Sequence, residues 1–124
     1  MDILGFEKLD VWQLSFEYVK NCYTLINKFP KEENYALCDQ LRRSAVSVPS
    51  NIAEGTGRMS YKEKIHFLEI AFGSLMESYC QLRIAHELNY ITEPELSSIK
   101  DQVFSISRML NALRTSYVEK SNNL

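Results

Sequence analysis

Glu63 and His66 form the one residue pair in this sequence whose spacing is typical of a metal site. A Glu-x-x-His pair places a carboxylate and an imidazole on one helix face, and ferritin-like bundles hold two metal ions with two such pairs and two further carboxylates. The only other histidine, His86, has Arg83 at the position that needs a glutamate. We therefore interpret His66 as a surface residue near a helix start and expect no metal or other cofactor. A ferritin-like metal-dependent enzyme is the alternative.

The three cysteines do not indicate nucleophilic catalysis. Cys22, Cys38 and Cys80 are far apart, without a C-x-x-C pair, which predicts buried free thiols in a reducing compartment. Cys80 and His86 lie six residues apart, so a helix would place them on different faces. The sequence also contains no G-x-S-x-G motif and no phosphate-binding loop. These patterns predict a protein that is not an enzyme.

Basic residues gather in the window from Arg42 to Lys64. This window holds five basic and two acidic residues, whereas the rest of the chain holds nine and fourteen. Repeated around an oligomer, such a window could attract phosphates of RNA or DNA. The competing interpretation is that the cations are solvated, contact subunits or form salt bridges with Asp39 and Glu54, four residues before Arg43 and Arg58. The candidate contact residues are Arg42, Arg43, Arg58, Lys62 and Lys64.

Four segments must position these residues, and each repeats apolar side chains at alternating steps of three and four. This pattern places each set on one side of an α-helix. The sets are Leu9, Trp12, Phe16, Val19, Tyr23 and Ile26; Cys38, Leu41, Ala45, Val48 and Ile52; Tyr61, Ile65, Leu68, Phe72, Leu75, Tyr79 and Leu82; and Leu96, Ile99, Val103, Ile106, Leu110, Leu113 and Tyr117. A chain of 124 residues suits one core. We predict a single all-α domain, 1–124, that folds as an up-down-up-down four-helix bundle.

The segments between these sets contain helix-ending and helix-starting residues. Gly55 and Gly57 suit a left-handed cap after the second helix. Ser60 with Glu63, and Thr92 with Glu95, have the spacing of capping boxes for the third and fourth helices. We expect a turn from Asn89 to Thr92 and a frayed tail from Ser121 to Leu124.

Pro49 breaks a local rule, because it lies inside the second apolar set and cannot donate a backbone hydrogen bond. Either the second helix kinks at Pro49 and continues to Gly55, which the unbroken pattern favours, or two shorter helices meet there. Asn51 and Glu54 follow within two turns. Asn51 could cap carbonyl groups freed by the kink or reach a neighbouring subunit, and we expect a structural role.

Further apolar residues lie beside the first sets and suggest self-association. A monomeric bundle needs one apolar arc per helix, so a surplus indicates another partner, although a wide core arc is the simpler alternative. The surplus residues are Val11, Leu14, Tyr18, Cys22, Leu25 and Phe29 in the first helix; Phe67, Ile70 and Ala71 beside Gly73 and Ser74 in the third; and Phe104, Met109 and Ala112 in the fourth.

Three stretches resemble a bacterial family. They are Leu9-Asp10-Val11-Trp12-Gln13; Gln40 to Ala45 with Ser47-Val48-Pro49-Ser50-Asn51-Ile52-Ala53-Glu54-Gly55; and Tyr79-Cys80-Gln81-Leu82. Together they are similar to the four-helix-bundle family called S23 ribosomal proteins, which are encoded in intervening sequences of ribosomal RNA genes. The most specific stretch is S-V-P-x-N-I-A-E-G.

The resemblance implies a ring-like homopentamer in the bacterial cytoplasm. A related branch, the accessory variability determinant of diversity-generating retroelements, implies contacts with nucleic acid and a reverse transcriptase through a basic surface. The net charge of −2 departs from those basic relatives. No stretch approaches the roughly 20 apolar residues of a membrane span. We expect a non-catalytic, homo-oligomeric interaction scaffold, with nucleic acid as a candidate partner.

Overall fold

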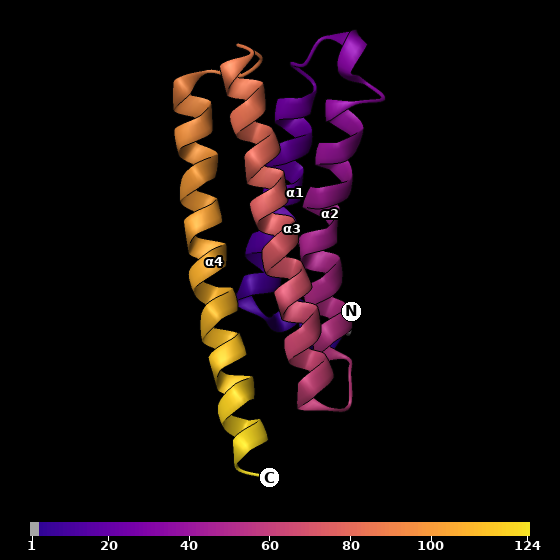
Figure 1. Cartoon of the computed structure of the whole chain (residues 1–124), viewed down its shortest axis with the longest axis vertical. Helices are drawn as coiled ribbons and strands as arrows, with labels where there is room; N and C mark the ends of the chain where they lie inside the picture. The colour runs from indigo at the N-terminus through magenta and orange to yellow at the C-terminus, as the bar shows by residue number, and fades with distance from the viewer. Residues whose placement is uncertain (1–2) are drawn as a thin grey trace.

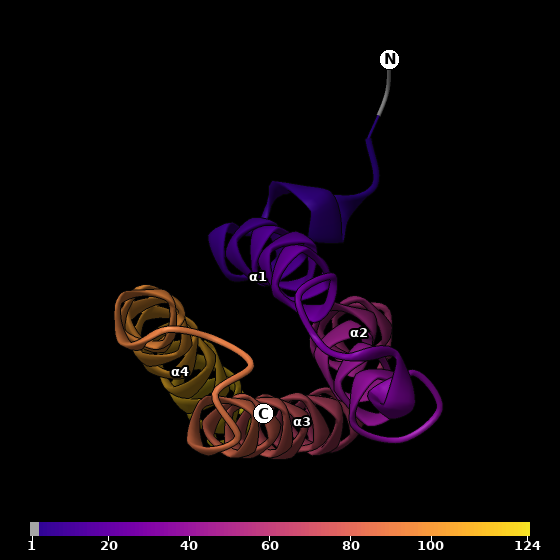
Figure 2. The same cartoon turned by 90° about the horizontal axis from the view of Figure 1, so that it is seen from above.

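A computed structural model describes residues 3–124, which form four α-helices and two short 3₁₀-helices (Figure 1). The elements in chain order are η1 (Gly5–Lys8), α1 (Asp10–Ile26), η2 (Lys31–Glu33), α2 (Leu37–Thr56), α3 (Tyr61–Glu87) and α4 (Glu93–Asn122). Consecutive helices run in opposite directions, and Figure 2 shows them in chain order around a common centre. The predicted all-α up-down-up-down bundle is confirmed.

The helix starts follow the predicted capping chemistry, fully in α4 and partly in α3. Before α4, the Thr92 hydroxyl accepts from the Glu95 amide at 3.3 Å, and the Glu95 carboxylate accepts from the Thr92 amide at 2.8 Å. Before α3, Ser60 accepts from the Glu63 amide at 3.1 Å, but no reciprocal bond from Glu63 forms. These bonds satisfy amide groups that the first turn of a helix leaves without partners.

Two expectations about helix ends are wrong. Gly57 ends α2 with a right-handed φ of −83°, and Gly55 lies inside the helix, so neither forms a left-handed cap. The left-handed residue is Asn89, with φ of 64°, in the predicted turn after α3. The expected frayed tail is helical through Asn122, and Figure 1 shows α4 extending beyond the ends of the other helices.

The core consists mainly of the apolar sets predicted for α2, α3 and α4. In α2 all five members are buried. In α4 the members from Leu96 to Leu110 are buried, and in α3 the leucines are buried while the other members, such as Phe72, are half-buried. Burying apolar surface contributes roughly 25 cal/mol per Å², which makes these buried apolar residues the main source of stability. A 3-4 spacing therefore identified the inward face of these three helices correctly.

In α1 the assignment of the two apolar sets is reversed. The set regarded as surplus supplies the core, with Val11, Tyr18 and Cys22 at most 5% exposed. In the set regarded as core, Phe16 and Tyr23 are 46% and 42% exposed. Both sets have helical spacing, so periodicity alone could not choose between them. Tyr18 carries a polar hydroxyl group, so the sequence alone did not suggest it as a core residue.

Helix α2 passes through Pro49 without interruption, which excludes two separate helices at this point. The proline ring is buried, so its missing amide lies in a packed part of the helix. The kink itself stays a prediction. No helix among residues 3–124 has the length and apolar character that a membrane crossing requires.

Candidate functional site

Gly55, from the most specific stretch of the sequence, marks the closest approach between α2 and α3. A Cβ atom added at Gly55 would lie 2.9 Å from Cβ of Phe67 and 3.2 Å from the backbone oxygen of Lys64. Helices can approach this closely only where a side chain is absent. The requirement for glycine is therefore steric, and α2 and α3 are the most extensively packed pair in the bundle.

Asn51 connects α2 internally and, through Ser47, to α3. Its amide nitrogen donates to the backbone oxygen and to the hydroxyl of Ser47, both at 2.8 Å. The Ser47 hydroxyl in turn lies 2.8 Å from the hydroxyl of Ser74. The carbonyl group that loses its partner to Pro49 belongs to Ala45, four residues earlier, so Asn51 bonds a different carbonyl from the one we expected.

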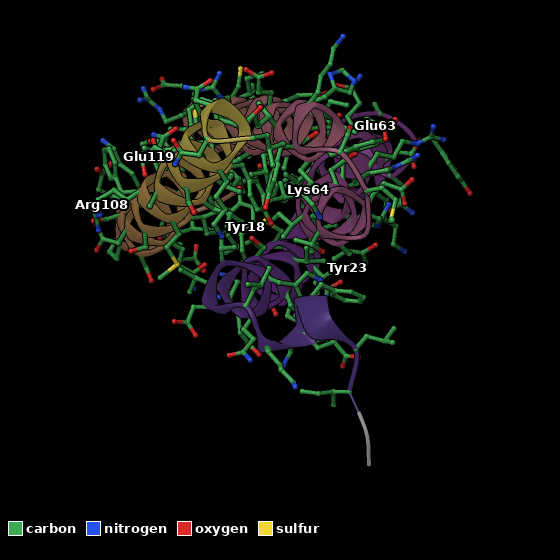
Figure 3. All side chains as sticks on the ribbon, turned by 90° about the horizontal axis from the view of Figure 1, so that it is seen from below. Tyr18, Tyr23, Glu63, Lys64, Arg108 and Glu119 are labelled. Atoms are coloured by element: carbon green, nitrogen blue, oxygen red, sulfur yellow. The ribbon has the colours of Figure 1, made fainter. Side chains whose placement is uncertain are left out.

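The interior contains two further polar contacts. The Tyr18 hydroxyl lies 2.7 Å from the Ser78 hydroxyl, and Ser44 donates to the side-chain oxygen of Gln81 at 2.7 Å. Burial raises the pKa of Tyr18 well above its ordinary value, and burial raises the pKa of Cys22 to about 12. Figure 3 shows Tyr18 between the helices. Both groups are therefore neutral, which makes them structural and not nucleophilic.

The structure separates the five basic candidates into two groups along α2. Arg42 and Arg43 lie in its second turn, whereas Arg58, Lys62 and Lys64 lie beyond its other end. Arg43 pairs with Asp39 at 3.3 Å, and Arg42 contacts the backbone oxygen of Asn34 at 3.4 Å. One protomer therefore has no single compact basic patch made of these five residues.

Most of the second group is engaged within the chain. Arg58 pairs with Glu54 at 2.5 Å and lies over the ring of Phe67, 4.6 Å from its centroid. Lys64 donates to the backbone oxygen of Thr56 at 2.9 Å and lies over the ring of Tyr117; Figure 3 shows it directed between the helices, away from Glu63. Lys62 is exposed and has no carboxylate within 4 Å among the described residues.

The metal-site and cysteine residues are dispersed. Glu63 and His66 are both exposed, and residues 3–124 contain no group of three His, Cys, Asp or Glu side chains that could hold a metal ion. Cys22 and Cys38 are buried as predicted, but Cys80 is exposed, so that part of the prediction is wrong. Its neighbours in α3 face the core, and a helix turn of 100° per residue places Cys80 outside.

An aromatic groove on the outer side of α1 and α2 is the surface that sequence reasoning missed. We define it as Phe6, Trp12 and Phe16 on one side and Pro49, Ser50 and Ala53 on the other, around a hollow of about 280 Å³. The Trp12 ring lies 5.2 Å from both Phe6 and Phe16, stacked on the latter. The signal was present in the sequence, because Trp12 and Phe16 have helical spacing, but we assigned them to the core.

The adjoining surface of α2 extends this groove. A second hollow continues from Phe6, Ser50 and Ala53 to Gly57 and Arg58. The residues around the two hollows include four of the nine residues of the S-V-P-x-N-I-A-E-G stretch. Pro49, Ser50 and Ala53 line the groove, Glu54 lines the second hollow, and the other buried members pack the bundle.

These features define the class of protein: an antiparallel four-helix bundle with an apolar outer groove and dispersed basic residues. Residues 7–112 match the profile of the family described as 23S rRNA-intervening sequence protein, and the chain belongs to this family. This confirms the resemblance seen in the sequence.

One solved structure supports the same fold. It is the crystal structure of a protein of unknown function from the S23 ribosomal protein family of Bacteroides thetaiotaomicron VPI-5482, with a TM-score of 0.77 and 24% sequence identity. The alignment covers 84% of this chain and 97% of that one. No curated protein matches the sequence.

Proposed function

We propose that this protein is a non-catalytic interaction scaffold that acts as a homo-oligomer. The observation that carries the proposal is the aromatic groove, in which Phe16 is 46% exposed beside a half-buried Trp12. Contiguous exposed aromatic surface is typical of protein interfaces. The family resemblance supports five copies as the stoichiometry.

Exposed apolar side chains also lie on α3 and α4. Phe104 in α4 is 53% exposed, and Ile84 in α3 is 45% exposed. Single exposed apolar residues are ordinary, but two separated apolar surfaces allow each copy to contact two neighbours. That arrangement supports a ring better than a dimer.

Light scattering coupled to size exclusion tests the assembly. We expect the purified protein at micromolar concentration to have a mass several times 14.4 kDa, near five times for the proposed pentamer. A monodisperse species of one chain mass would reject the proposal. Metal analysis of the same sample tests the alternative ferritin-like enzyme, which requires bound metal in stoichiometric amounts.

Nucleic acid binding is the second candidate function, and the free charges of Arg42 and Lys62 favour it. Neither side chain has a carboxylate within 4 Å among residues 3–124, so both are available to phosphates. In a ring, each would recur once per copy. Binding that depends on phosphate contacts weakens with salt, with a log–log slope of roughly 0.7 to 0.9 per phosphate neutralised.

Fluorescence anisotropy with structured RNA and duplex DNA at two salt concentrations tests this candidate. The double variant Arg42→Gln/Lys62→Gln should lower both the affinity and the salt slope while the assembly keeps its mass. The matched control is Lys31→Gln/Lys120→Gln, which removes two cations outside the basic window. An absence of binding at 50 mM salt would reject the nucleic acid role and leave the scaffold with protein partners.

A further inference from the structure

Three exposed residues of α4 place an aromatic ring between two cations. Phe104 is 53% exposed, and Lys100 and Arg108 lie about one helical turn before and after it. Steps of four residues keep all three on one side of the helix. The Lys100 ammonium lies 5.9 Å from the centroid of the Phe104 ring, and Arg108 contacts the Ser105 hydroxyl at 3.5 Å. Figure 3 shows Arg108 at the outer edge of the bundle. We name Lys100, Phe104 and Arg108 the α4 stripe.

The charges of the α4 stripe are not neutralised within the chain. Neither cation has a carboxylate within 4 Å among residues 3–124. Between Glu95 and Glu119, α4 holds three basic residues and a single acidic one, Asp101. The third basic residue, Arg114, pairs with Glu69 of α3 at 3.0 Å. The middle of α4 is therefore locally positive, although the net charge of the whole chain is −2.

The exposed side of α3 has a different character. Met76, Ile84 and Leu88 are 39%, 45% and 48% exposed, and Cys80 is exposed one turn before Ile84. An apolar surface of this kind suits the contact with a neighbouring copy proposed above, and it does so without a ring from α4. An apolar partner would cover the α4 stripe at a cost, because two cations would lose their water. The stripe thus fits a negatively charged partner better than a second subunit.

Single-stranded nucleic acid has the chemistry that matches the stripe. Proteins that bind single strands stack bases on aromatic side chains and hold the backbone with basic ones. In a duplex the bases pair with and stack on one another, so an exposed ring finds no free base face. Lys100 and Arg108 lie about 12 Å apart along the helix axis, at 1.5 Å per residue. This distance leaves room for a base on the ring, with a phosphate reaching the cation on each side.

We propose that the α4 stripe binds an unpaired stretch of RNA or DNA, with one base on the Phe104 ring and the adjoining phosphates on Lys100 and Arg108. The inference rests on nucleic acid binding, the second candidate function, and names the surface and the kind of strand. One stacked base and two phosphates bind weakly, and several copies in one assembly strengthen binding to the same strand. The ring offers no hydrogen-bonding group, so base identity should matter little.

Fluorescence anisotropy with an unstructured single strand of about 12 nucleotides tests the contact. The natural protein should bind this strand more tightly than a hairpin of the same composition. Phe104→Leu keeps an apolar side chain but removes the flat ring. It should weaken binding at least about five-fold, the lower end of what one base stacked on an aromatic ring contributes. Phe104→Trp should bind at least as tightly as the natural protein. Circular dichroism and light scattering check that both variants keep the fold and the mass.

The matched control is Phe16→Leu, which removes a comparably exposed ring, 46% against 53%, from the aromatic groove. It should leave the affinity for the single strand unchanged. If Phe16→Leu weakens binding and Phe104→Leu does not, the bases bind in the groove and the inference is overturned.

A strand without bases isolates the role of the ring. An abasic strand of the same length keeps its phosphates, so the natural protein and Phe104→Leu should bind it equally weakly. A difference between the two proteins on the abasic strand would show that Phe104 does not act by stacking on a base, which also overturns the inference.

Salt dependence tests the two cations. Lys100→Gln/Arg108→Gln should lower the log–log slope by roughly 1.4 per engaged copy, because each phosphate of a single strand contributes roughly 0.7. The control Lys31→Gln/Lys120→Gln should keep the slope of the natural protein. An unchanged slope in the first variant would mean that the stripe does not hold the backbone.

The two proposals about nucleic acid fail in different ways. If the natural protein binds no single strand, hairpin or duplex at low salt, the candidate function fails and the α4 stripe fails with it. If binding depends on Arg42 and Lys62 while every α4 variant behaves like the natural protein, the candidate function stands and only the stripe is rejected. A loss of mass in Phe104→Leu would identify the stripe as a subunit contact and overturn the inference as well.

Discussion

The α2–α3 seam and the α1–α4 seam of the same bundle are packed in different ways. In the first, the missing side chain of Gly55 lets the helices come close together, and Ser47–Ser74 and Ser44–Gln81 contacts cross between them. In the second, the helices share the fewest contacts of the four neighbouring pairs. A cleft of about 350 Å³ lies between them, lined by residues such as Asn21, Leu25 and Gln102.

The difference shows where the sequence is constrained. Close packing leaves no room for another side chain, which is the steric reason for Gly55 in α2. A seam with a cleft tolerates change, because neighbouring side chains can move into free space. We therefore expect substitutions in the α2–α3 seam to cost more than matched substitutions in the α1–α4 seam.

Truncation of buried aliphatic residues gives the largest expected difference. Ile52 is fully buried, and Leu25 is 8% exposed at the edge of the cleft. Ile52→Ala should lower the free energy of unfolding by about 3–5 kcal/mol, and Leu25→Ala by about 2 kcal/mol, because the site around Leu25 can collapse. Urea unfolding at one protein concentration measures both, since oligomers require matched concentrations. Equal losses would mean that the two seams are equally well packed.

Two glycines inside helices provide the second test. Gly55→Ala should lower the free energy of unfolding by about 1–3 kcal/mol, because the new methyl group meets Phe67 and the Lys64 backbone. Gly73→Ala is the matched control, since nothing lies within 4 Å of an added Cβ there. That substitution should raise stability by about 0.5–1 kcal/mol through helix propensity alone. Thermal melting should thus shift in opposite directions, and a stabilising Gly55→Ala would contradict the close approach.

Much of the fold follows from the sequence because its signals are local. The spacing of apolar residues identified the inward faces of α2, α3 and α4, and Thr92 with Glu95 identified a helix start. Two features depended on tertiary contacts instead. Gly55 is required by Phe67 of another helix, not by a turn, and α1 has two apolar sets whose choice depends on where α2 and α4 lie.

The candidate site was harder to predict from the sequence, because it also depends on tertiary contacts. Basic residues could be counted, but their availability depends on partners: Arg58 has Glu54, and Lys64 bonds the backbone of Thr56. The pairs of Arg43 and Arg58 were expected from i, i+4 spacing, whereas the position of Lys64 was not. The aromatic groove needs Phe6 from η1, and a short 3₁₀-helix has no periodic signal.

Tyr18 and Tyr79 differ in the hydrogen bonding of their buried hydroxyl groups. Tyr18 bonds Ser78 at 2.7 Å, whereas the buried hydroxyl of Tyr79 has no hydrogen-bond partner among residues 3–124. Tyr18→Phe should lower the free energy of unfolding by about 0.5–1.5 kcal/mol, and Tyr79→Phe should be neutral or stabilising. Urea unfolding of both variants measures the difference. A larger loss in Tyr79→Phe would reveal a partner that forms only in the assembly.

The smallest expected effect concerns an ion pair across the α1–α4 seam. It joins Lys28, just after α1, to Glu95, in the first turn of α4. The hydrogen bond from Lys28, followed by that from the Thr92 backbone, lowers the pKa of Glu95 below its ordinary value. A carboxylate with a lowered pKa stabilises the folded state above the unfolded-state value near 4.5, and this contribution disappears as the pH falls through the folded-state pKa.

Lys28→Met should therefore lower stability by at most about 1 kcal/mol at pH 7, because the pair is partly exposed. The deficit should shrink toward zero as Glu95 becomes protonated, whereas Lys28→Arg, which keeps the charge, should behave like the natural protein. Urea unfolding between pH 3 and pH 7 provides the measurement. A deficit that persists at pH 3 would mean that the aliphatic stem of Lys28 and not its charge holds α1 against α4, and the α1–α4 seam would then depend on packing as the α2–α3 seam does.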